Sequence, residues 1–175
     1  MLYTRKGDGG TTKTLHYDRR LSKSSLIAEA LGAVDELNSL LGLIKTQAPK
    51  SAGELAQVQQ NLFIIQAELA GAPGQTIAQE KVAALEKTID EIERELPPIK
   101  SFFIPGGTAP GAWYDFARAV ARRAERRVVA AREEKLILLG GATLVYLNRL
   151  SSLLYALARL TNHKAGIKEE SPSYK

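Results

Sequence analysis

Residues 24–46, SSLIAEALGAVDELNSLLGLIKT, decide the fold class of this chain. Apolar side chains recur in this segment at intervals of three, four and seven residues, which places them on one face of an α-helix. The members of this stripe are Ile27, Leu31, Val34, Leu41 and Ile44. The segment is therefore predicted to be an amphipathic helix that buries the stripe against other helices.

Two further helices are predicted from their N-terminal signals. The sequences SAGE at 51–54 and TIAQ at 76–79 both have the pattern of a capping box. The first helix is expected to end near Leu69 and the second before the LPP sequence at 96–98. The second carries apolar residues in alternating steps of three and four, the pattern of a bundle seam: Val82, Leu85, Ile89, Ile92 and Leu96.

The C-terminal half of the chain adds two longer helices. One is predicted from about Ala109 to Glu133, with Pro110 tolerated in its first turn. The other is predicted from Leu144 to about His163, after the break at LLGGAT. No stretch alternates as a β-strand would. The expected fold is an all-α, up-and-down five-helix bundle preceded by a short glycine-rich segment.

Length and composition limit the organisation and the setting of the protein. At 175 residues, the chain is predicted to be one domain over 1–175. Its parts are an N-terminal segment (1–23), the bundle (24–165) and a tail (166–175). A polar N-terminus, no cysteine and no apolar run of about 18 residues favour a cytoplasmic protein without a membrane span. The net charge of +5 indicates an anionic partner, such as nucleic acid, anionic lipid or polyphosphate.

The fourth predicted helix is rich in arginine. Arg118, Arg122 and Arg126 recur every four residues and so share one face. One interpretation is a solvated basic face. The use of Arg rather than Lys instead favours recognition of carboxylates or phosphates. The predicted core stripe of this helix is Phe116, Val120, Ala124 and Val128, which would leave some of the arginines near the interior and in need of a partner.

Asp35 is the candidate partner for these arginines. It follows Val34 and borders the apolar stripe of the first helix. Taken alone, it could equally be an ordinary surface carboxylate. A pair between Asp35 and an arginine of the fourth helix would satisfy both charges.

The sequence TRKGDGGTT at residues 4–12 combines glycines, hydroxyls and cations. Backbone amides that allow close approach, Thr hydroxyls and a Lys suit a triphosphate, and Lys23 adds a second cation. The segment does not match the P-loop pattern, and a flexible N-terminus is the alternative. His16 and His163 lack the spacing of metal ligands, and no metal site is predicted.

Five stretches together resemble one family. They are TRKGDGGTT, ALGAVDELNSLLG, FFIPGG, RAVARRAERRVV and YLNRLSSLLYALAR, and they occur in order over nearly the whole chain. In this they resemble the PduO-type ATP:cob(I)alamin adenosyltransferases. The resemblance implies a homotrimer of five-helix bundles with active sites between subunits. It implies transfer of the 5′-deoxyadenosyl group of ATP to the cobalt of reduced cobalamin, with release of triphosphate.

The resemblance also implies roles for individual residues. The ATP-binding set would comprise Thr4, Arg5, Gly7, Asp8, Gly10, Thr11, Thr12, Lys23, Arg122, Glu125, Arg126 and Asn148. Asp35 and Arg118 match a pair used across the subunit interface beside the corrin. Phe102 matches the aromatic that covers the lower face of the corrin. The alternative is that Phe102 fills part of the hydrophobic core, as an aromatic residue in a loop ordinarily does. Mg²⁺ would enter with ATP through its phosphates. A cobalamin reductase and an adenosylcobalamin-dependent enzyme are the partners to expect.

The chain departs from the family pattern at three places. Ser152 replaces an acidic residue in LNRLSS, SSL follows Lys23 where acidic residues are frequent, and GTAPGAWYDF differs from the usual small-residue run.

Two other functions are the alternatives to an adenosyltransferase. A helical nucleic-acid-binding protein would explain the charge, but exposed aromatic platforms and a basic tail are not evident. A non-catalytic oligomerising bundle would leave the glycine-rich segment without a purpose.

Overall fold

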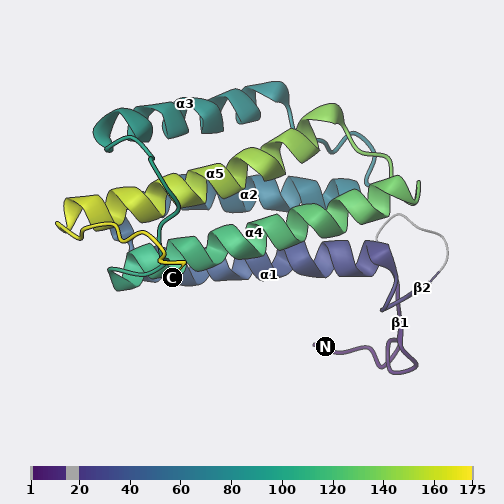
Figure 1. The fold of residues 1–175 in the computed structure, drawn as a ribbon. Coiled ribbons are helices and arrows are strands. Elements are labelled where there is room, and N and C mark those ends of the chain that lie inside the picture. Colours follow the sequence, from purple (N-terminus) through teal and green to yellow (C-terminus); the bar gives the residue numbers. More distant parts are fainter. Residues whose placement is uncertain (1, 15–19, 175) are drawn as a thin grey trace.

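The computed structural model describes residues 2–14 and 20–174. Five helices run alternately up and down along one axis (Figure 1). They are α1 (Leu26–Gln47), α2 (Ala52–Leu69), α3 (Gln79–Glu95), α4 (Ala109–Glu133) and α5 (Gly141–Lys164). A 3₁₀ turn, η1 (Pro49–Ser51), joins α1 to α2. The predicted all-α five-helix bundle is confirmed, although α5 begins three residues before the predicted start at Leu144.

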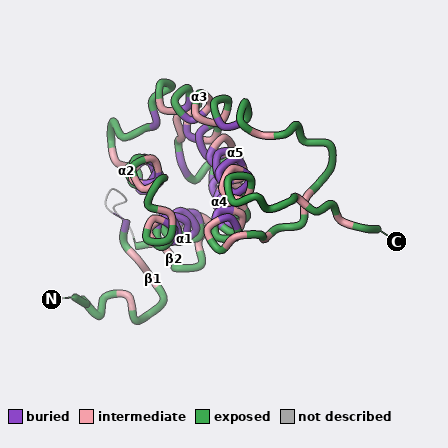
Figure 2. Tube along the Cα trace, turned by 90° about the vertical axis from the view of Figure 1, so that its left-hand side faces the viewer, coloured by how far each residue is buried: buried purple, intermediate pink, exposed green. Residues whose placement is uncertain are grey.

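The helices do not all pack in sequence order. The main contacts join α1 to α2, α1 to α4, α4 to α5 and α5 to α3. In the end-on view of Figure 2, α5 lies below α3, and α4 and α1 lie side by side below α5. The connection from α3 to α4 therefore crosses the outside of the bundle.

The buried face of α4 explains how closely it packs against α1 and α5. Half of its buried residues are alanines, which let neighbouring helix axes approach. Val120, Ala124 and Val128 are buried as predicted, but Phe116 is 52% exposed and does not belong to the core. Each step of four residues turns about 40° beyond a full turn of helix. Three such steps from Val128 carry position 116 off the core face, and Tyr114 is buried instead.

Neither predicted capping box caps its helix, and two side chains that were not predicted as caps do so elsewhere. Ser25 caps α1 by accepting from the Ala28 amide at 3.3 Å, and Thr108 caps α4 by accepting from the Gly111 amide at 3.1 Å. Ser51 precedes α2 but makes no capping hydrogen bond, because it ends a 3₁₀ turn and its backbone (φ −102°, ψ 7°) is not extended. The capping box predicted at residues 51–54 is therefore not formed.

The helix after TIAQ begins two residues later than predicted. Its N-cap is Ala78, and α3 starts at Gln79. The Thr76 hydroxyl donates to the buried carboxylate of Glu68 at 3.0 Å and does not cap the helix. Tertiary structure thus uses the capping side chain elsewhere.

The N-terminal segment contains a short antiparallel hairpin that sequence reading did not anticipate. Strand β1 (Thr11–Thr12) pairs with β2 (Leu21–Ser22), with Thr11 opposite Ser22. The segment leaves the bundle beside the start of α1 (Figure 1). In Figure 2 the N-terminal segment and the C-terminal tail leave on opposite sides of the bundle.

Candidate active site

The glycine-rich segment folds into a turn that brings Lys23 against it. Arg5 and Gly10 adopt positive φ values of 59° and 78°. The Lys23 amide then donates to the Gly10 carbonyl at 2.9 Å. A Cβ on Gly7 would lie 3.3 Å from the Lys23 ammonium nitrogen, so glycine at this position leaves the room that the Lys23 side chain occupies. The two predicted parts of the phosphate site, the segment and Lys23, are therefore adjacent.

Arg20 holds this turn together, and sequence reasoning missed it. Its Nε donates to the Thr11 hydroxyl and its Nη2 to the Thr11 carbonyl, both at 2.8 Å. The same Nη2 donates to the Lys6 carbonyl at 2.5 Å. Nothing in the spacing signalled this role, because residues 6 and 20 meet only when the hairpin forms.

The arginines of α4 point to solvent rather than to the interior. Arg122 and Arg126 are exposed, and Arg126 donates to the Arg122 carbonyl at 3.1 Å. The prediction that arginines of this face lie near the interior and need a partner there is therefore wrong for Arg122 and Arg126. The charges of this face are open to a ligand or to another chain.

Two other arginines of α4 tie it to α1. Arg123 pairs with Glu36, and Arg127 lies 3.8 Å from Glu29. These are the ion pairs between α1 and α4 in the described residues. The expected pair between Asp35 and an arginine is not among them.

Asp35 and Arg118 each have a different partner within the chain. The Asp35 carboxylate is exposed and accepts from Gln66 Nε2 at 3.4 Å. Arg118 Nε donates to the Asp115 carboxylate at 2.7 Å, one turn earlier on α4. The intrachain version of the Asp35–arginine pair is therefore corrected: Asp115, not Asp35, neutralises Arg118 within one chain.

A cavity of about 590 Å³ opens beside Arg118. The loop between α3 and α4 contributes Phe102, α4 contributes Arg118 and Arg122, and α5 contributes Ser152 and Tyr155. Phe102 is 77% exposed and is not a core plug. Burial raises the pKa of the Tyr155 phenol on the α5 side. The cavity thus combines an unburied aromatic ring with two guanidinium groups, and Ser152, a departure from the family pattern, faces the same space.

The polar pair Glu125 and Asn148 joins α4 to α5. Asn148 Nδ2 donates to Glu125 Oε1 at 3.0 Å, and Asn148 Oδ1 accepts from Arg149 at 2.8 Å. Two residues predicted to lie near a nucleotide are therefore in contact. Arg122, from the same predicted set, belongs to the cavity beside Phe102.

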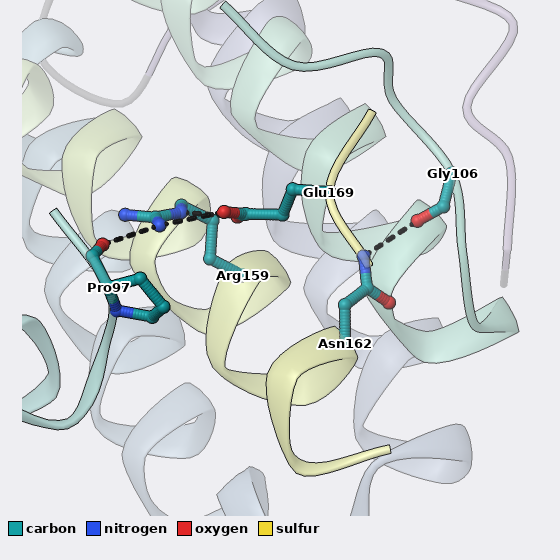
Figure 3. Close-up of polar contacts among 5 residues, drawn as sticks. All are labelled: Pro97, Gly106, Arg159, Asn162 and Glu169. Atoms are coloured by element: carbon teal, nitrogen blue, oxygen red, sulfur yellow. Dashed lines mark hydrogen bonds and ion pairs between the residues drawn. The ribbon is translucent and has the colours of Figure 1, made fainter. Parts of the chain in front are cut away.

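The loop that carries Phe102 is attached to α5 by buried or partly buried polar groups (Figure 3). Arg159 donates to the Pro97 carbonyl at 2.9 Å, and Asn162 Nδ2 donates to the Gly106 carbonyl at 2.8 Å. Asn162 Oδ1 also accepts from the Thr108 amide at 2.9 Å. These side chains did not stand out in the sequence, because Arg and Asn near a helix end are usually solvent-exposed.

The two halves of the predicted site lie apart in a single chain. The glycine-rich segment leaves one side of the bundle, whereas the loop from α3 to α4 crosses the other side (Figure 2).

His163 is exposed in the last turn of α5, and His16 lies outside the described residues. None of the helices in residues 2–14 and 20–174 is both long and apolar enough to cross a membrane.

Proteins with a similar sequence and fold are named as corrinoid adenosyltransferases. The family model described as cobalamin adenosyltransferase matches residues 2–161. The corrinoid adenosyltransferase PduO of Citrobacter freundii is 43% identical over 172 residues, covering 94% of this chain and 50% of the relative. The corrinoid adenosyltransferase of Bacillus subtilis is 38% identical over 175 residues, covering 95% of this chain and 89% of the relative. The chain thus spans about half the length of the Citrobacter relative.

A solved structure has nearly the same fold. It is a variant PduO-type ATP:corrinoid adenosyltransferase from Lactobacillus reuteri, complexed with cobalamin and ATP. Its TM-score is 0.92 at 30% sequence identity, and the alignment covers 99% of this chain and 97% of that chain.

Proposed function

Because this chain belongs to the cobalamin adenosyltransferase family, we propose that it transfers the 5′-deoxyadenosyl group of ATP to the cobalt of reduced cobalamin. The products are adenosylcobalamin and triphosphate. The names of the Bacillus subtilis and Lactobacillus reuteri proteins support both the corrinoid and the ATP of this reaction. The protein is then a transferase with two substrates that must meet at one site.

The observation that carries the proposal is the exposed ring of Phe102 beside two arginines. An aromatic side chain with 77% of its surface in water gains little from folding. Its exposure is explained if the ring covers a flat apolar ligand such as a corrin. Arg118 and Arg122 on the same cavity can meet anionic or carbonyl groups around that ligand.

The nucleotide is proposed to lie between the glycine-rich segment of one chain and the arginine face of another. Amides and hydroxyls of residues 4–12 and the Lys23 ammonium would hold the triphosphate, with Arg122, Arg126, Glu125 and Asn148 completing the site. The separation of the two halves in one chain supports a shared site, and hence the homotrimer that the family resemblance implies. In such an assembly, Asp35 of one chain could pair with Arg118 of its neighbour.

In this reaction the side chains would hold and orient the substrates and would not transfer protons. The electron pair of cobalt(I) forms the bond to C5′, and the C5′–O bond breaks with its electrons leaving on triphosphate. No proton is transferred, so no general base is needed. The cations of the site would hold the leaving group in line with the cobalt and stabilise the charge that develops on it.

A metal ion, further partners and the location follow from the same proposal. Mg²⁺ would accompany ATP on its phosphate oxygens. This arrangement needs no protein cage, and the described residues contain no group of three or more potential metal-ligating side chains. A reductase that supplies cobalt(I), an enzyme that receives adenosylcobalamin, the cytoplasmic location and the single-domain organisation stay predictions.

The test is the formation of adenosylcobalamin from chemically reduced cobalamin and ATP, followed by its visible spectrum. Failure to form it, in the presence of Mg²⁺, would contradict the proposal. A thermal melt with and without ATP separates the enzyme from a purely structural bundle, since a ligand of the native state raises the melting temperature. Binding to nucleic acid that falls steeply with salt would instead favour the nucleic-acid alternative.

A further inference from the structure

The loop from α3 to α4 is held at both ends by one face of α5. Arg159 and Asn162 are three residues apart and therefore lie on the same side of the helix. Arg159 donates to the Pro97 carbonyl at the start of the loop, at 2.9 Å. Asn162 donates to the Gly106 carbonyl near its end, at 2.8 Å (Figure 3). The two ends of the loop are thus fixed to the bundle.

The middle of the loop is held by the C-terminal tail. The Ile104 amide donates to the Glu170 carbonyl at 2.8 Å. The Ser101 and Ser171 hydroxyls are 2.7 Å apart. These two contacts lie on either side of Phe102 along the chain, so the tail binds the Ser101 side chain immediately before this residue and the Ile104 backbone shortly after it.

The tail is itself anchored by an ion pair with Arg159. Arg159 Nε and Nη2 donate to the two Glu169 carboxylate oxygens at 2.5 Å and 2.9 Å. The guanidinium is only 6% exposed and lies 5.2 Å from the centre of the Phe103 ring. A two-pronged pair of this kind is directional as well as strong. Arg159 therefore joins the start of the loop, Phe103 and the tail at one point.

The position of Phe102 depends on these backbone contacts rather than on the packing of its own ring. With 77% of its surface exposed, the ring has few neighbours in the chain that could hold it. We propose that the C-terminal tail, residues 166–171, is a clamp that sets the position of Phe102, with Arg159 and Glu169 as positioning residues. The inference rests on the proposed function, in which Phe102 covers the corrin.

The substitution Glu169→Gln tests the clamp. It keeps the shape of the side chain but removes the charge that pairs with Arg159. The matched control is Glu95→Gln, which removes an exposed ion pair with Lys164 at the same end of α5 and leaves the pair between Arg159 and Glu169 in place. Both variants are measured for ATP-dependent turnover from cobalt(II) cobalamin with a reductant, for the KM of ATP, and for amide exchange at Ile104.

A misplaced group can lower a rate by ~100-fold per ångström, so we expect Glu169→Gln to lower turnover by about tenfold or more. The KM for ATP should stay unchanged, because Glu169 binds Arg159, which is not among the residues proposed to hold the nucleotide. The Ile104 amide should exchange faster in Glu169→Gln than in Glu95→Gln. The visible spectrum of bound cobalt(II) cobalamin, which reports a lower axial ligand, should change only in Glu169→Gln.

Two results would overturn the inference. One is equal turnover and equal Ile104 exchange in the two variants. The other is faster exchange in Glu169→Gln with turnover and spectrum unchanged, which would make the clamp a purely structural contact. If the parent protein forms no adenosylcobalamin, the proposed function fails and the role assigned to the clamp fails with it. Exchange at Ile104 would still report separately whether Glu169 anchors the tail.

Discussion

Replacing Phe102 by alanine tests whether this residue covers a ligand or fills the hydrophobic core. A Phe side chain has an accessible surface of about 200 Å², and roughly a quarter of Phe102 is buried. At ~25 cal/mol per Å², the truncation removes about 1 kcal/mol from the free energy of unfolding. For a chain of this length that lowers the melting temperature by about 2–4 °C. A buried Phe would cost ~3–5 kcal/mol instead.

The functional effect of Phe102→Ala should be large by comparison. A ring below the corrin keeps a lower axial ligand away from cobalt, which makes cobalt(II) easier to reduce. We therefore expect a sharp fall in turnover when the assay starts from cobalt(II) cobalamin, with ATP binding retained. Starting from cobalt(I) cobalamin should restore part of the lost rate.

The matched control is Ile104→Ala, in the same loop. Ile104 is 55% exposed but does not line the cavity that holds Phe102 and Arg118. The control should lose a similar amount of stability and keep its turnover. Equal turnover of Phe102→Ala and the control in both assays would refute the role of Phe102. If Phe102→Ala lost the ~3–5 kcal/mol expected for a buried Phe, the conclusion that Phe102 lies outside the core would be refuted.

Three further predictions concern the nucleotide, the subunit interface and the core. Lys23→Ala and Arg122→Ala should each weaken ATP binding by about 1.5–3 kcal/mol in calorimetry, the effect of one charge-assisted contact, while the melting temperature hardly changes. Asp35→Ala and Arg118→Ala should be non-additive in trimer stability and turnover if the two residues pair across subunits, and additive losses would contradict the pairing. Burial raises the pKa of Tyr146 to about 12 from its ordinary 10.0, so the folded protein keeps a phenol proton that the unfolded chain loses. The Tyr146 contribution to stability in urea titrations should thus fall by up to ~1.4 kcal/mol per pH unit between about pH 10 and 12. Tyr146→Phe should make the fall less steep and leave the part due to Tyr114 and Tyr155, whose pKa values burial also raises.

The helices of this protein could be predicted from sequence because their signal is local. The stripe from Ile27 to Ile44 and the seam of α3 depend only on the 3.6-residue period and on which side chains are apolar. The prediction failed where a local rule was extended too far. Phe116 continues the four-residue spacing of Val120 and Val128, yet the helix has turned it out of the core by that point.

The separate parts of the candidate site were also visible in the sequence. The glycine-rich segment, Lys23 and the arginines of α4 have side chains and backbone that suit phosphate, whatever the fold. Their relations were not visible. Arg20 meets Lys6 and Thr11 only because the hairpin pairs β1 with β2.

The sequence by itself determined the five helices, their amphipathic faces and the chemical character of the segments that match the family, since each of these depends on neighbours along the chain. Only the tertiary structure decided which charges meet. It paired Arg123 of α4 with Glu36 of α1, and it joined Arg159 to the tail through Glu169. It also left Phe102 in solvent while Phe103 packs near Arg159. The physical reason is that ion pairs and burial depend on the order in which helices pack, and here α3 packs mainly on α5 rather than on its neighbours in sequence.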